Sequence, residues 1–108
     1  MIKNLTPHDV TIIFDDGSTR VIPSSGVARA AQTSVDVAIV DGITICKMVF
    51  GDPVDLPDPA ADTHLIVSVI TANAAKAAGR ITDDLLITAD PVRDDDGKIV
   101  GCKRLARI

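Results

Sequence analysis

The chain has 108 residues, a formal net charge of −4 and a hydrophobic content of 46%, with aromatic residues making up only 2%. A chain of this size predicts one domain, residues 1–108, with a single core built from aliphatic side chains. The acidic balance argues against binding to duplex nucleic acid, because that mode needs a surplus of Lys and Arg to contact the phosphates. A small anionic ligand needs only a local group of donors, so the net charge leaves that class open.

The chain lacks the sequence signs of export or membrane insertion. It opens without a charged region followed by an apolar run, and no stretch approaches about 18 consecutive apolar residues. We therefore expect no contact with a membrane and a location in the cytoplasm. In that compartment Cys46 and Cys102 would stay reduced.

Two hairpins are predicted in the first half. Residues 11–14 (TIIF) and 19–23 (TRVIP) flank an Asp-Gly turn at 15–18, and Asp-Gly supplies the positive φ that a hairpin turn requires. Residues 35–40 alternate apolar and polar side chains and reach a second Asp-Gly, after which the return strand is expected at 43–51 (ITICKMVFG).

The second half predicts a loop, a helix and a third hairpin. Residues 51–62 carry three prolines and four aspartates with little periodicity, which is typical of a surface loop. A buried strand is expected at 63–67. Ser68 is a natural N-cap and Gly79 a natural residue after a helix C-terminus, so one helix of about three turns is expected between them. A last Asp-Gly turn at 94–97 joins two strands.

These elements predict a mainly β (α+β) fold, in which antiparallel hairpins form a small barrel or a strongly twisted sheet with one short helix packed on it. Ile70, Ala74 and Ala77 fall on one face of the helix, which suits close packing against a sheet. Strand 35–40 would lie at an edge. An unpaired β edge invites another chain, so we expect a homo-oligomer.

The first candidate site is the segment Thr6-Pro7-His8, directly before the first predicted strand. Pro7 pushes Thr6 toward extended geometry and removes a backbone donor, which places His8 at the rim of the sheet. One interpretation is that the imidazole of His8 contacts a bound ligand. The other is a surface or capping histidine held by a neighbouring carboxylate.

The second candidate site is the start of the helix. Free backbone N–H groups at Val69 and Ile70, the Ser68 hydroxyl and the helix dipole together form a site for an anion such as phosphate. The alternative is plain N-capping by Ser68, which every helix start needs.

Basic residues in the last third of the chain offer further contacts to an anion. Period-two alternation would place Arg104 and Arg107 on opposite faces of a strand, so that one of them could face a pocket. The remaining basic residues, Arg80 among them, are expected to pair at the surface with the aspartates at positions 83, 84 and 90.

Neither metal binding nor catalysis has a recognisable motif. The two histidines and two cysteines lack the C-x-x-C or H-x-x-x-H spacing of a zinc site, so no metal is expected. No G-x-S-x-G elbow, P-loop or G-x-G-x-x-G occurs, so neither a cofactor nor an enzymatic activity is expected. One enzymatic alternative remains, a small hydrolase that uses His8 as its general base.

Five segments of the chain carry a family resemblance. They are NLTPHDVTI at 4–12, FGDPVDLPDP at 50–59, LIVS at 65–68, DDLL at 83–86 and PVRDDDGKIVGCKRLAR at 91–107. With its N-terminal LTPH motif followed by an apolar strand, nearly the whole chain resembles a family of small proteins encoded by bacteriophages and prophages. It departs from similar chains in having His64-Leu65 where they carry an aromatic residue.

The resemblance implies a non-catalytic protein that sequesters a small nucleotide-derived immune signal, of the cyclic nucleotide or ADP-ribose type, in the cytoplasm of the host bacterial cell. The helix start would hold phosphate, and the proline-stiffened loop would border the pocket. The residues expected to contact this small anionic nucleotide are Thr6, Pro7, His8, Pro57, Pro59, Ser68, Val69, Arg80, Arg104 and Arg107. The alternative is a virion or assembly component that acts through protein–protein contacts of its β edges and its proline-rich loop.

Overall fold

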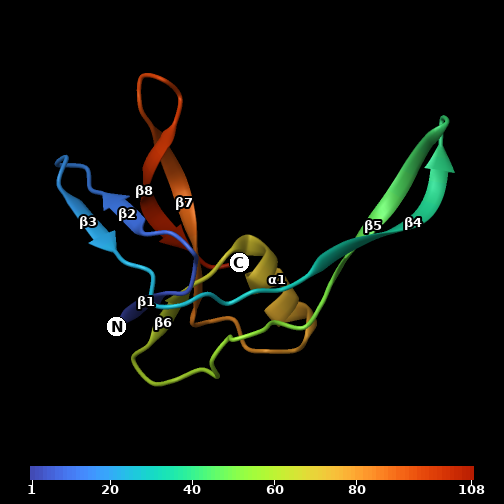
Figure 1. Ribbon diagram of the computed structural model, residues 1–108, viewed down its shortest axis with the longest axis horizontal. Coiled ribbons are helices and arrows are strands. Elements are labelled where there is room, and N and C mark those ends of the chain that lie inside the picture. The colour runs from blue at the N-terminus through green and yellow to red at the C-terminus, as the bar shows by residue number, and fades with distance from the viewer.

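The computed structural model describes residues 1–108 and is mainly β with one helix, as predicted (Figure 1). The elements in chain order are β1 (Ile2–Asn4), β2 (Val10–Ile13), β3 (Thr19–Ile22), β4 (Gln32–Val40), β5 (Ile43–Phe50), β6 (His64–Ile66), α1 (Val69–Ala77), β7 (Leu85–Arg93) and β8 (Ile99–Ala106). No helix of the chain is long and apolar enough to span a membrane.

The three predicted hairpins are confirmed. β2 pairs with β3, β4 with β5 and β7 with β8, each pair antiparallel. The two-residue turn between β4 and β5 has positive φ at both Asp41 (50°) and Gly42 (77°), which is the geometry of a type I′ turn. Gly17 and Gly97 supply the positive φ in the other two turns. Local turn chemistry therefore fixes each hairpin.

The body of the molecule is one six-stranded sheet with the strand order β1-β6-β7-β8-β2-β3. The chain just after β3 returns to β1 through a bridge between Asn4 and Ser24, so the sheet is a nearly closed barrel. Three pairings, β1 with β6, β6 with β7 and β2 with β8, are parallel. The strand expected at 63–67 is β6, but the parallel pairings and β1 were not predicted, because a three-residue strand carries no periodicity and no local turn sets a parallel pair.

The helix begins and ends as its sequence predicts. Ser68 is the N-cap, and its hydroxyl accepts a hydrogen bond from the Thr71 amide at 3.1 Å. At the other end Gly79 has φ +84°, and the Arg80 amide donates to the Ala75 carbonyl at 3.0 Å. This bonding satisfies carbonyls of the last turn that would otherwise lack donors.

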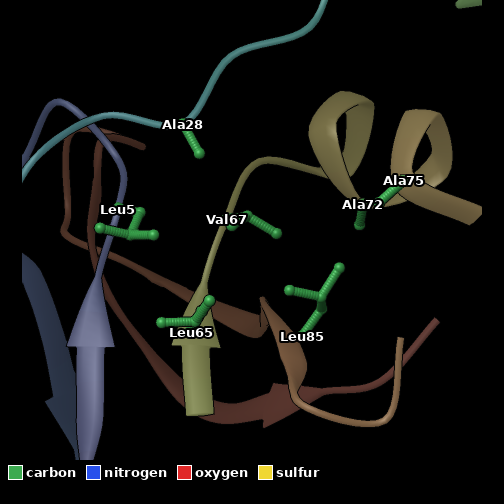
Figure 2. Packing of buried hydrophobic residues seen from close by; sticks show 7 residues of the cluster. All are labelled: Leu5, Ala28, Leu65, Val67, Ala72, Ala75 and Leu85. Atoms are coloured by element: carbon green, nitrogen blue, oxygen red, sulfur yellow. The ribbon is translucent and has the colours of Figure 1, made fainter. Parts of the chain in front are cut away.

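Two small clusters form the core. One lies inside the barrel and consists of Val10, Ile12, Ile22, Ile66 and Cys102. The other lies between the helix and the sheet, where Ala72 and Ala75 of α1 face Leu85 and Val67 (Figure 2), and its members are Leu5, Ala28, Leu65, Val67, Ala72, Ala75 and Leu85. The small alanine side chains allow the helix to approach the sheet closely.

Strands β4 and β5 form a separate two-stranded ribbon that projects far from the body (Figure 1). We call residues Gln32–Phe50 the arm. Every residue from 31 to 49 is exposed, and none of the 15 buried residues of the chain lies in the arm. The chain reaches 50 Å along its longest axis, and its radius of gyration is 16.4 Å, whereas about 13 Å is typical of a compact domain of this length.

Candidate functional site

The buried side chain of Asn4 organises the turn that carries Thr6, Pro7 and His8. Its amide nitrogen donates to the carbonyls of His8 at 2.8 Å and Ile22 at 3.0 Å. Its oxygen accepts from the Thr6 amide at 3.0 Å and the Thr6 hydroxyl at 2.6 Å. Asn4 is 0% exposed, so all four bonds hold a fixed turn at the point where the barrel closes.

This turn faces the start of α1 across a shallow hollow of about 320 Å³. Four of the predicted ligand residues, Thr6, His8, Ser68 and Val69, line it together. The remaining lining residues are Asp9, Val10, Val67, Ile87 and Thr88. The two candidate sites of the sequence analysis are therefore one place in the fold.

A second hollow, of about 400 Å³, shares the lining residues Thr6 and Ser68 with the first. Pro7 lines it, and so does Arg29, the only arginine or lysine at either hollow. The sequence analysis did not select Arg29, which precedes the arm in a segment without a motif. Its nearness to the helix start follows from the neighbouring Ala28, whose carbonyl accepts a hydrogen bond from the Thr71 hydroxyl at 3.3 Å, a long-range contact that no local pattern indicates.

The donors at the helix start are only partly free. The Ser68 hydroxyl is already engaged with Thr71, accepting from its amide and donating to its hydroxyl at 2.9 Å. The Val69 and Ile70 amides donate to no group of the chain, so two N–H groups remain for a ligand or for water. Asp9 also lines the hollow, and its negative charge opposes a negatively charged ligand.

Arg80 lies at the opposite end of the helix and serves the fold. Its guanidinium makes a two-pronged ion pair with Asp84, at 2.8 and 3.0 Å, and donates to the Pro57 carbonyl at 2.7 Å. Both charged side chains are mostly buried, at 14% and 12% exposed. Pro57 and Pro59 thus belong to a loop that is fastened to Arg80 and line neither hollow.

The other two predicted arginines lie elsewhere again. Arg104 in β8 pairs with Asp90 in β7, and this hydrogen-bonded carboxylate raises the pKa of Arg104. Arg80 and Arg104 thus pair with two of the three expected aspartates, but the Arg80–Asp84 pair is mostly buried and not at the surface. Arg107 follows the end of β8, is exposed, and makes no ion pair. None of these arginines lines the hollows beside Thr6.

A third hollow, of about 390 Å³, lies against β2, β7 and β8 and is largely apolar. Cys102 is among its lining residues, and the pKa of this buried thiol is raised because burial disfavours the thiolate. Nowhere in the chain do three or more His, Cys, Asp or Glu side chains gather in a way that could hold a metal ion.

No protein-family model matches the chain, and no curated protein or solved structure is significantly similar to it.

Proposed function

We propose that this protein acts through protein–protein contacts as an assembly component, without catalysis, and that the arm is its contact surface. The observation that carries the proposal is the apolar character of a ribbon that contributes nothing to the core. Eight large aliphatic or methionine side chains of the arm are exposed, from 41% for Ile45 to 74% for Ile39: Val35, Val37, Ile39, Val40, Ile43, Ile45, Met48 and Val49.

The total surface supports the same proposal. The chain exposes 7226 Å² of accessible surface. A monomeric protein of 11.3 kDa is expected to expose about 5,700 Å², which leaves an excess of about 1,500 Å². A partner in a stable complex typically covers about 800 Å² on each side. The chain therefore carries more surplus surface than one ordinary interface needs.

Capture of a small nucleotide is the second candidate. In its favour, Thr6, His8, Ser68 and Val69 line one hollow, where the Val69 amide lacks an acceptor in the chain. Against it, Asp9 lies at the same hollow and the predicted arginines lie elsewhere or are paired with aspartates. A phosphate-bearing ligand is usually held by several unpaired cationic donors. For these reasons we rank it below protein contacts.

The assembly proposal is tested in the strain that encodes the chain. Particles or large complexes are separated on a density gradient, and this protein is quantified in each fraction by mass spectrometry. We expect it in the heavy fractions, with loss to the light fractions when Ile45 is replaced by lysine. A wild-type protein that stays entirely among the free proteins would refute the proposal.

The ligand candidate is tested on purified protein by thermal shift with a panel of cyclic dinucleotides and cyclic ADP-ribose isomers. Tight capture would raise apparent stability by about 4 kcal/mol when the ligand exceeds Kd a thousandfold. The His8→Ala variant is the control, because His8 is exposed and its side chain makes no hydrogen bond in the chain. A shift with wild-type protein that His8→Ala abolishes would reverse our ranking of the two functions.

A further inference from the structure

We infer that the arm packs on the arm of a second copy of this chain, through one defined face. This inference rests on the proposed function and names its first partner. Its test uses purified protein alone, so it can fail or succeed independently of the particle experiment.

The pairing register divides the arm into two different faces. Residues directly opposite each other in an antiparallel pair lie on the same face. Val35 lies opposite Lys47, Ala38 opposite Ile45, and Val40 opposite Ile43. Thr33 lies opposite Val49 on the same face. We call this face the aliphatic face, and its residues are Thr33, Val35, Ala38, Val40, Ile43, Ile45, Lys47 and Val49.

The other face is mixed in character, and we call it the mixed face. It carries the pairs Gln32 with Phe50, Ser34 with Met48, Asp36 with Cys46 and Ile39 with Thr44. Each of these pairs joins a polar side chain to an apolar one, so this face is more polar than the aliphatic face. The aliphatic face has one charged side chain, that of Lys47. Its long apolar stem allows the ammonium group to lie at the edge of the face, in contact with water. The two faces therefore predict one buried side and one solvated side.

A two-stranded ribbon with one aliphatic face is not expected to leave that face exposed to water. Two-stranded hairpins are marginally stable alone, and three strands or a packed partner are normally needed. At the base of the arm, Gly51 donates to the Ala31 carbonyl at 2.8 Å, Arg29 pairs with Val54, and β5 contacts α1. No other segment of the chain covers the aliphatic face, since all its residues are exposed. Another molecule must supply the cover.

A second copy fits this requirement in area and in chemistry. An apolar face packed on its own equivalent is self-complementary, as a two-fold dimer requires. The strands of the arm run for about 30 Å, so two arms laid face to face bury a continuous apolar layer between them. Such a contact uses part of the surplus of about 1,500 Å² for which the isolated chain offers no cover.

The edges of the arm favour this face-to-face packing over the addition of strands side by side. A β-bulge interrupts the ladder between Asp36 and Ala38, where Val37 has no partner. Bulges and charged side chains on edge strands are devices that prevent edge-to-edge pairing.

The test is the molar mass of the purified chain, measured by light scattering or sedimentation equilibrium over a range of concentrations. We expect a mass near twice 11.3 kDa at micromolar concentration. Ile43→Lys and Ile45→Lys on the aliphatic face should weaken the dimer at least about a hundredfold, because each would bury an unpaired charge. Ile39→Lys is the matched control, since Ile39 is equally aliphatic and even more exposed but lies on the mixed face.

The single exposed thiol gives an independent readout. Cys46 lies on the mixed face and is exposed, so it should react with a maleimide at the same rate in the dimer and in the Ile45→Lys variant. A wild-type monomer at all concentrations would overturn the inference. Dissociation by Ile39→Lys but not by Ile43→Lys, or protection of Cys46 in the dimer, would overturn the assigned face. Circular dichroism and melting curves confirm that each variant is folded.

Discussion

Replacing Asn4 by alanine should destabilise the protein far more than the loss of one small polar side chain suggests. Asn4 joins the turn at residues 6–8 to the end of β3, and it does so at the bridge that closes the barrel. The substitution removes four hydrogen bonds at once and leaves their partners in place. The effect can be estimated bond by bond.

The bond to the Ile22 carbonyl is fully buried, and a buried acceptor left without its donor costs about 1–3 kcal/mol. The bonds to the His8 carbonyl and the Thr6 amide and hydroxyl are partly exposed, so water can replace the lost partner, and each is worth about 0.5–1.5 kcal/mol. Because the four bonds share one side chain, their contributions are not additive. We expect a loss of about 3–5 kcal/mol in the free energy of unfolding, a large share of the total for a small domain.

Urea unfolding at one fixed protein concentration measures this loss, with the slope against urea checked for constancy. Asn73→Ala is the matched control. Asn73 lies in the middle of α1, makes no side-chain hydrogen bond, and alanine is the better helix former, so this variant should be neutral or slightly more stable. If Asn4→Ala loses less than about 1 kcal/mol, the assigned bonds do not hold the turn, and our account of the LTPH segment fails.

Three further predictions concern other parts of the chain. Gly101→Ala should cost about 1–3 kcal/mol in urea unfolding, because a Cβ there would lie 2.8 Å from a backbone carbonyl of β2. Titration with a thiol reagent at neutral pH should show Cys46 reacting fast and Cys102 only on unfolding, since Cys102 is buried and its pKa is raised; equal rates would contradict the placement of β8. The pKa of Asp16 is lowered by hydrogen bonds from the Ser18 hydroxyl and amide, so its contribution to stability is present above its unfolded pKa and is lost as pH falls through the folded value. Carboxyl NMR titration should find that pKa raised in Ser18→Ala, and an unchanged value would refute the cause.

The hairpins and the helix could be predicted from the sequence because short-range chemistry determines them. Asp41-Gly42 fixes the β4–β5 turn, and Ser68 and Gly79 mark the two ends of α1. The barrel order could not be derived in the same way. It depends on parallel pairings between strands that are distant in the sequence, such as Ile12 with Cys102, and no turn residue encodes them.

The candidate site was predicted in part for a similar reason. Thr6, His8 and Ser68 were selected from local signals, a proline before a strand and a helix cap, and the fold brings these three residues to one hollow. The choice of Arg80 rested on charge alone. Charge does not indicate a partner, and the structure pairs Arg80 with Asp84 and the loop at Pro57. Which basic residue lies near the helix start depends on tertiary contacts, and that residue is Arg29.

The arm is where local sequence and monomeric structure disagree most. Its turn, its alternation and its β-branched residues all satisfy the rules for a stable strand pair. Yet a side chain such as Ile39 is 74% exposed, and no residue of the arm is buried. Sequences that fold reliably agree with their structure at every level, and violations concentrate where function requires them. The proposed contact would account for this hydrophobic content, and it would use the face on which Ile43 and Ile45 lie.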